Sequence, residues 1–353
     1  MCKTAIVILN WNGADMMRKY LPSVISNSYG DVIVADNAST DDSAQMLQKE
    51  FPDVRVIHMS ENYGFAEGYN RSLSQLSEYD YYILLNSDVR LTQKHWDKIL
   101  TDYMDEHPEC AACQPKLLDL KILERQESRH EPQHDAFEYA GACGGFLDQY
   151  GYPFCRGRIF GSVENDEGQY DDVTNILWAT GAALCVRASD WRMSGGLDPR
   201  FFAHMEEIDL CWRLRTMGRN IVCIPQSTAF HLGGATLSHS NPRKTFLNFR
   251  NNLLMLYKNL PQDELHKVMR TRMLLDFVAA AQFLIKGEMR NTKAVVSAYR
   301  SFRKMKKTYR PIREDLLTRR KTGHVNERYD ISIVWQYYVK GKRLFSELKL
   351  TDD

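Results

Sequence analysis

The sequence predicts an α/β protein with an open, doubly wound, mostly parallel sheet and a helical basic C-terminal region. Short β-branched or aromatic runs recur about every 25 residues near the start of the chain, with helical spacing of apolar residues between them. Beyond residue 260 the pattern is helical throughout. Right-handed crossovers in such a fold place helices on both sheet faces and ligands at the carboxyl ends of the strands.

Each expected element follows from its local pattern. Strands are expected at residues 4–9, 31–35, 54–58 and 81–85, and helices at 15–27, 41–50 and 65–78. Thr40, Asp41 and Asp42 provide a favourable helix start, because their side chains accept hydrogen bonds from free amides.

The composition is that of an ordinary globular protein, with 353 residues, 44% hydrophobic and 26% charged, which excludes disorder as the main state. The longest apolar run, 273–285, is interrupted by Asp276 and Gln282 and is shorter than the roughly 20 residues of a membrane-spanning helix. No small-residue cleavage site follows the first apolar run, so no export is expected. Most of the eight cysteines lie in apolar strings, as reduced buried thiols would, and the lone Cys110–Cys113 pair is a weak metal signal. We therefore expect a cytoplasmic protein.

The charge is unevenly distributed. Residues 250–353 hold 23 Lys and Arg against 11 Asp and Glu, whereas residues 1–249 hold 23 against 34. Basic runs at 300–310 and 319–321 fit an anionic membrane surface, and a solvated helical face is the alternative. No nucleic-acid partner is expected, because the larger, acidic part shows no recognisable binding module.

Polar turns follow three of the expected strands. They are Asn10-Trp11-Asn12-Gly13, Asp36-Asn37-Ala38-Ser39-Thr40 and Asn86-Ser87-Asp88. The glycine-rich turn of dinucleotide-binding domains is missing after the first strand, which argues against an NAD-binding domain. Asp36 stands where such folds keep a carboxylate for a ribose or base, and Asp88 suits a divalent cation that neutralises a diphosphate. Together the turns favour a nucleotide site.

ILNWNG, VADNASTDDS, ENYGFAEGYN and LLNSDV, in this order, resemble the family 2 inverting glycosyltransferases of the GT-A fold. WATGAALCVR, FFAHMEEIDLCWRL and FHLGGATLS resemble later segments of the same family. The nearest branch is the rhamnosyltransferase-like proteins of bacterial surface polysaccharide synthesis. The resemblance implies a GT-A nucleotide-sugar-binding and catalytic domain at 1–260, followed by the helical region at 261–353.

The resemblance also implies roles at the donor end of the site. Asp36 matches the residue that binds the nucleobase, and the donor-binding positions are completed by Asn10, Asn12, Asn62, Gly64 and Asn86. Asp88 and His231 match the metal ligands, while Asn86 replaces the first Asp of the family's D-x-D element. An imidazole beside a carboxylate suits Mn²⁺ better than Mg²⁺. The alternative for His231 is a hydrogen-bonded core histidine.

Glu206 and Glu207 match the family's acidic catalytic motif, in which the second residue is the base. An acceptor hydroxyl must lose its proton as it attacks the anomeric carbon, and the Glu207 carboxylate is expected to take it. Glu207 shares a helix face with Leu210 and Leu214, so partial burial should raise its pKa. Glu206 stays an alternative base, and Asp209 is expected to pair with Arg213 four residues on.

Other residues are expected around the sugar and the diphosphate. By resemblance, Trp178 and Gly181 line the sugar and acceptor pocket, with a core aromatic as the alternative for Trp178. Lys244 belongs to a basic loop with Arg243 and Arg250 that is expected to close over the diphosphate, and surface solubility is its rival explanation. Residues 119–175 are expected to form an irregular insertion that shapes the acceptor site.

The sequence thus predicts a metal-dependent inverting glycosyltransferase. It would move a sugar, with L-rhamnose from dTDP-rhamnose named first, from a nucleoside-diphosphate sugar donor to a glycan or lipid-linked acceptor. Its place would be the cytoplasm, including the inner face of the cytoplasmic membrane. A UDP-hexose-dependent enzyme of the same fold and a non-catalytic nucleotide-binding scaffold protein are the alternatives. An enzyme that makes sugar nucleotides would need a glycine-rich N-terminal turn, which NWNG lacks.

Overall fold

The computed structural model describes residues 2–132, 134–233 and 241–350. Within these residues nine strands form one large mixed sheet, with the path β11-β13-β6-β12-β4-β1-β2-β3 and β5 paired to β13. Its strands are β1 (Thr4–Asn10), β2 (Asp31–Asp36), β3 (Arg55–His58), β4 (Tyr81–Leu85), β5 (Val89–Arg90), β6 (Cys110–Asp119), β11 (Thr174–Asn175), β12 (Ala183–Arg187) and β13 (Asn220–His231).

The four expected strands form the parallel part of this sheet, in the order β3-β2-β1-β4. The three expected helices connect them as α1 (Ala14–Asn27), α2 (Ser43–Glu50) and α3 (Gly64–Leu73), and the last ends earlier than expected. The doubly wound prediction is therefore confirmed.

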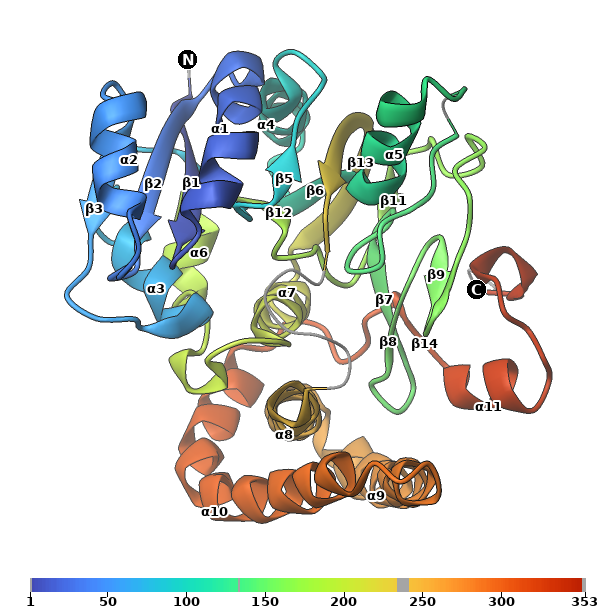
Figure 1. Ribbon diagram of the computed structural model, residues 1–353. Coiled ribbons are helices and arrows are strands. Elements are labelled where there is room, and N and C mark those ends of the chain that lie inside the picture. Colours follow the sequence, from blue (N-terminus) through green and yellow to red (C-terminus); the bar gives the residue numbers. More distant parts are fainter. Residues whose placement is uncertain (1, 133, 234–240, 351–353) are drawn as a thin grey trace.

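Helices cover both faces of the sheet (Figure 1). Alternate side chains of β1 point to opposite faces. Ile6 and Ile8 join the core with α1, α2 and α4 (Trp96–Glu106), whereas Ala5 and Val7 join the core with α3, α6 (Ala188–Ser194) and α7 (Glu206–Thr216). All eight cysteines are free, and all except Cys2 are buried, as expected for reduced thiols.

Beyond β4 the sheet becomes mixed, and this change sets the geometry of the site. β12 runs antiparallel to β4, with Ala183 opposite Leu85. The start of β12 therefore lies at the edge where β4 ends, and the Asn86 amide donates to the Ala182 carbonyl at 3.0 Å. β5 is antiparallel to β13, with Val89 opposite His231.

The insertion at 119–175 is more regular than expected. It holds α5 (Leu120–Arg129), the short strand β11 and four strands of a second sheet, whose order is β10-β9-β8-β7-β14 and whose fifth strand, β14, comes from the C-terminal region. The strands of that sheet are β7 (Gly145–Asp148), β8 (Pro153–Cys155), β9 (Arg158–Ile159), β10 (Ser162–Val163) and β14 (Arg328–Tyr329). Gly151 and Gly157 have φ of 75° and 101°, so the glycines that suggested irregularity serve the turns between these strands.

The C-terminal region is helical, as predicted. It holds α9 (Gln262–Ile285), α10 (Met289–Arg319), α11 (Ile333–Tyr338) and the 3₁₀ turn Phe345–Glu347, and another 3₁₀ turn, Pro199–Phe201, precedes α7. Figure 1 shows α8 (Pro242–Asn259) between α7 and the α9–α10 pair. In the described part of the chain no helix is long and apolar enough to cross a membrane. The domain boundary at residue 260 stays a prediction.

Candidate active site

The polar turns after β1 and β2 meet at one edge of the sheet. Asn10 is buried, and its Nδ2 donates to Asp36 Oδ1 at 3.3 Å and to Ser39 Oγ at 3.2 Å. Asn10 Oδ1 has no hydrogen-bond partner, and a Cβ added at Gly13 would lie only 2.5 Å from it. The turn therefore leaves a buried acceptor beside the Asp36 carboxylate.

Asn12 joins the two turns. Its φ is 52°, and its Oδ1 accepts from the Thr40 amide at 2.7 Å. An Asn adopts this left-handed conformation more easily than most residues, because its short side chain bonds locally. Asn10, Asn12 and Asp36 are thus brought together, as the sequence predicted.

Asn37 fixes the next loop, and sequence reasoning gave it no role. Its Nδ2 donates to Asn62 Oδ1 and to the Gly64 carbonyl, both at 3.1 Å, and its Oδ1 accepts from the Tyr63 amide at 3.0 Å. Gly64 has φ 75°, and a Cβ there would lie 2.7 Å from the Phe202 ring. Asn62 and Gly64 are therefore held beside the end of β2.

Asp88 and His231 lie side by side, because β5 pairs with the end of β13. His231 Nε2 is 3.1 Å from Asp88 Oδ1 and 3.2 Å from Asn86 Nδ2. Both Asp88 and His231 are buried. The two predicted metal ligands and Asn86 form one cluster. Residues 234–240, including the rest of the FHLGGATLS segment, lie outside the described residues.

Glu138 stands behind the histidine, on the side away from Asp88. Its Oε1 is 3.2 Å from His231 Nδ1, and its carboxylate is buried. Burial disfavours the imidazolium, but the nearby Asp88 and Glu138 carboxylates outweigh it and raise the pKa of His231 to about 10. Burial also opposes ionisation of Asp88, yet the bond to His231 leaves the Asp88 pKa below its ordinary value. No sequence signal marked Glu138.

In many metal sites a carboxylate orients the outer nitrogen of a ligating histidine, and Glu138 lies in that position beside His231 Nδ1. Among the described residues no group of three or more His, Cys, Asp or Glu side chains converges as a complete metal site. A cation held by Asp88 and His231 would take its other ligands from elsewhere.

Two carboxylates stand at the start of α7. Glu206 is 3% exposed and Glu207 is partly buried, and one oxygen of each has no hydrogen-bond partner. Burial raises the pKa of Glu207 to about 7. Burial and the neighbouring Glu207 charge raise the Glu206 pKa well above its ordinary value. The pair is therefore poised to hold or accept a proton near neutral pH.

The segment before these carboxylates has a strained backbone. Phe202, His204 and Met205 have φ of 66°, 71° and 73°, which non-glycine residues rarely adopt. Asn251 of α8 holds the segment, because its Nδ2 donates to three carbonyl oxygens within residues 201–204, at 2.8 to 3.0 Å. Sequence reasoning did not find Asn251.

Asp209 has the structural role that the sequence predicted, within a larger network. It is fully buried, and its Oδ2 lies 3.0 Å from Arg213 Nε and 2.7 Å from Lys258 Nζ. Asn259 Nδ2 donates to its other oxygen at 2.9 Å. The network anchors α7 to α8.

Gly181 and Trp178 have different surroundings. A Cβ at Gly181 would lie 3.0 Å from Phe65 Cζ and 3.9 Å from Glu207 Cβ, so Gly181 lies beside the carboxylate pair. Trp178 is a core residue, and its indole N–H donates to the Phe146 carbonyl at 3.0 Å. This placement corrects the expectation that Trp178 lines the sugar pocket.

The expected basic loop is part of α8. Arg250 donates to the carbonyls of Arg200 and Phe201 at 3.0 Å, so it supports the strained segment. Lys244 acts on His204, two residues before α7: burial, and then the Lys244 charge, lower the pKa of His204 to about 4. Burial lowers the pKa of Lys244 itself. Lys244 and Arg250 thus lie on a helix and not on the loop that was expected to close over the diphosphate.

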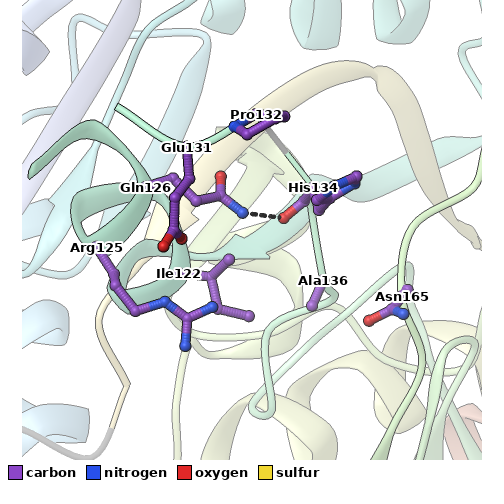
Figure 2. Close-up of a pocket in the computed structure, with 8 residues that line it drawn as sticks. All are labelled: Ile122, Arg125, Gln126, Glu131, Pro132, His134, Ala136 and Asn165. Carbon is purple, nitrogen blue, oxygen red and sulfur yellow. Dashed lines mark hydrogen bonds between the residues drawn. The ribbon is translucent and has the colours of Figure 1, made fainter. Parts of the chain in front are cut away.

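A separate cavity of about 320 Å³ lies between α5 and a segment that includes Glu131, Pro132, His134 and Ala136 (Figure 2). Gln126 Nε2 donates to the His134 carbonyl across it at 2.7 Å. The predicted site residues do not line this cavity.

Comparison with known proteins identifies the first half of the chain. Residues 5–165 match the family model for glycosyl transferase family 2. This segment of the chain therefore resembles a family 2 glycosyltransferase domain. Phe201–Thr216, with the two carboxylates, lies beyond the matched residues of this domain.

Rhamnosyltransferases are among the proteins to which this chain is similar. The N-acetylglucosaminyl-diphospho-decaprenol L-rhamnosyltransferase of Mycobacterium tuberculosis is 28% identical over 210 residues, which are 57% of this chain and 66% of the relative. The rhamnosyltransferase WbbL of Escherichia coli K12 is 24% identical over 231 residues, covering 64% of this chain and 82% of the relative. The match thus spans just under two thirds of the mycobacterial protein.

Solved structures show that the fold is GT-A. S. aureus TarS 1-349 in complex with UDP-GlcNAc aligns with a TM-score of 0.53 and 14% identity, covering 85% of this chain and 80% of TarS. GalNAc-T7, solved with UDP, GalNAc and Mn²⁺, aligns with a TM-score of 0.55 and 12% identity, covering 73% of this chain and 48% of that one. The GT-A prediction is confirmed.

Proposed function

We propose that the protein is a metal-dependent inverting glycosyltransferase that moves a sugar from a nucleoside-diphosphate donor to a hydroxyl of a glycan or lipid-linked acceptor. The observation that carries the proposal is the buried pair Glu206–Glu207, with unpartnered oxygens and a Glu207 pKa of about 7. The family 2 domain and the rhamnosyltransferase relatives support L-rhamnose from dTDP-rhamnose as the first donor to test.

The donor end is assigned to the turns after β1 and β2. Asp36 is acceptor-only when ionised, so it suits the N3–H of thymine or uracil. Both bases carry that group, so Asp36 alone does not select dTDP over UDP. Asn10, Asn12, Asn62 and Gly64 shape the same edge of the sheet, and we assign them to the nucleotide.

Asp88 and His231 would hold the divalent cation. Their oxygen and nitrogen donors are adjacent, at 3.1 Å, and fit Mn²⁺ better than Mg²⁺. When bound, the cation would neutralise the charge of the leaving diphosphate. Asn86 contributes no charge to this cluster, so we expect weak metal affinity without nucleotide.

Glu207 is the proposed base. The acceptor oxygen forms a bond to the anomeric carbon as the bond to the diphosphate oxygen breaks, and the hydroxyl proton passes to the Glu207 carboxylate. Attack from the face opposite the leaving group inverts the anomeric centre. Gly181 lies beside Glu207 and is assigned to the acceptor side of the site, and Lys244 adds positive charge near the start of α7.

Calorimetry with dTDP, UDP and GDP, with and without Mn²⁺, tests the donor end in wild type and Asp88→Asn. We expect manganese-dependent binding of one diphosphate that Asp88→Asn loses. Preference for UDP would favour the UDP-hexose alternative. Binding without transfer to any acceptor, unchanged in Glu207→Gln, would favour a nucleotide-binding scaffold. Absence of metal-dependent binding would refute the donor site.

A further inference from the structure

The outward face of α9 divides into a polar half and an apolar half. His266, Lys267 and Arg270 are exposed on the first half. Leu274, Val278 and Ile285 follow on the same side of the helix and are 66%, 67% and 86% exposed. Phe277 and Leu284 widen this stripe and are exposed as well. A monomer rarely leaves so many large apolar side chains together in water.

The inward face of α9, in contrast, has polar partners for its buried groups. Asp276 is fully buried and accepts from Arg272 Nε at 2.8 Å and from the Tyr299 hydroxyl at 2.9 Å. Arg272 Nη1 also donates to Asn252 Oδ1 at 2.6 Å. These bonds fix which side of α9 faces α8 and α10, so the apolar stripe stays outside.

A cationic groove lies along one side of the stripe. The groove, about 200 Å³, runs between α9 and α10 and has a floor that includes Met269, Met273 and Phe302. Its exposed cations are Arg270, Arg303 and Lys306, and none of them forms an ion pair with a described residue. The Phe277 ring stacks on Tyr299 of the groove, with centroids 5.4 Å apart, so groove and stripe are continuous.

We infer that α9 docks on an anionic phospholipid membrane, with the stripe Leu274–Ile285 in the boundary between head groups and acyl chains and a lipid phosphate over Arg270, Arg303 and Lys306. An apolar stripe flanked by cations is the pattern of a helix that lies in the membrane interface. The unpaired cations favour a negatively charged lipid surface over an apolar surface of a second copy.

The proposed membrane contact does not include every cation of the basic C-terminal region. Arg313 donates to the carbonyls of Tyr257 and Leu260 at 2.6 and 2.7 Å, and Arg320 donates to the Asn259 carbonyl. These cations hold the C-terminal end of α8 and are not available to lipid. The inference goes beyond the proposed transfer reaction, because docking needs neither donor nor acceptor.

Flotation of the full chain with phosphatidylglycerol or phosphatidylcholine vesicles tests the inference. We expect flotation with phosphatidylglycerol and little with phosphatidylcholine. Val278→Glu/Ile285→Glu should reduce vesicle binding at least about tenfold, whereas Ile25→Glu/Met193→Glu, which adds the same charge at exposed apolar positions elsewhere, should not. Arg303→Gln/Lys306→Gln should reduce it about fivefold per charge, and Lys3→Gln/Lys49→Gln is the matched control.

Circular dichroism and dTDP or UDP binding confirm that each variant is folded, so a failure of docking is distinguishable from a failure of the donor site. Equal flotation of wild type and Val278→Glu/Ile285→Glu would overturn the inference, as would absence of wild-type flotation. Sedimentation velocity gives a further test. A wild-type dimer that Val278→Glu/Ile285→Glu converts to a monomer, with no vesicle binding, would assign the stripe to a second copy and overturn membrane docking.

Discussion

Replacing Glu207 by Gln should abolish transfer and stabilise the fold at the same time. Burial raises the Glu207 pKa from 4.5 to about 7, so the folded state favours the protonated carboxyl. Its stabilising contribution is fully present below pH 4.5 and is lost as pH rises through 7. One pKa unit corresponds to about 1.4 kcal/mol, so the ionised carboxylate destabilises the fold at pH 8 by up to about 3 kcal/mol.

The two effects are measured separately. Urea unfolding at pH 8 should show Glu207→Gln more stable than wild type by up to about 3 kcal/mol, and nearly equal to it at pH 4.5. The transfer rate should fall by a factor of about 10² to 10⁴, the usual contribution of a general base, while donor affinity stays the same. In wild type the ionised fraction rises from about a tenth at pH 6 to about nine-tenths at pH 8, and the rate should follow it.

Glu106→Gln is the control, because Glu106 is exposed on α4 and the same substitution there should change neither quantity. Loss of stability in Glu207→Gln at pH 8 would refute the argument from burial. Retained transfer would refute the assignment of the base. Loss of transfer in Glu206→Gln alone would give that role to Glu206.

Four further predictions test other parts of the site. Glu138→Gln should weaken manganese-dependent diphosphate binding about 10- to 100-fold in calorimetry and leave metal-free binding unchanged. Equal losses of affinity with and without manganese would contradict the proposed role of Glu138 in orienting His231. Asp36→Asn should lower the affinity for dTDP and UDP alike by about tenfold or more, since a charged hydrogen bond contributes about 1.5–3 kcal/mol. Lys258→Met should reduce the free energy of unfolding by about 3–5 kcal/mol in urea, because Lys258 Nζ lies 2.9 Å from Asp198 and 2.7 Å from Asp209, and both buried carboxylates lose this shared cation. Asn251→Ala should lower kcat about tenfold or more with little change in donor KM, and a change in stability alone would make Asn251 merely structural.

The parallel half of the fold was predictable because its strands are buried and connected by helices. Residues 4–9 and 81–85 therefore show as apolar runs, each bounded by polar turns. The second sheet was not predictable. Its strands have two to four residues, and β14 pairs Arg328 with Leu147, far apart in the sequence. Such short strands carry no periodic pattern.

Candidate site residues could be predicted where the residue type itself limits the chemistry, as it does for carboxylates. Asp36 and Asp88 stand at the carboxyl ends of buried parallel strands, so both carboxylates lie at the same edge of the sheet. Asn37 and Asn251 escaped prediction because amides are common in turns and helices, and their role depends on which backbone groups they reach. Trp178 was expected either in the sugar pocket or in the core, and it lies in the core. The hydrogen bond that its indole donates to a core carbonyl cannot be read from the sequence.

The catalytic end of the site is less stable locally than the donor end. The donor turns satisfy most of their polar groups within residues 10–64, whereas the start of α7 holds two unpartnered carboxylate oxygens and three strained residues. Strain of this kind persists only where surrounding contacts hold it, and α8 supplies them through Asn251, Arg250 and the Lys258 network. These residues all lie beyond the family 2 domain match at 5–165. The segment that matches the family model thus contains the proposed nucleotide end, and α8, which packs between α7 and the α9–α10 pair, fixes the geometry of the proposed base.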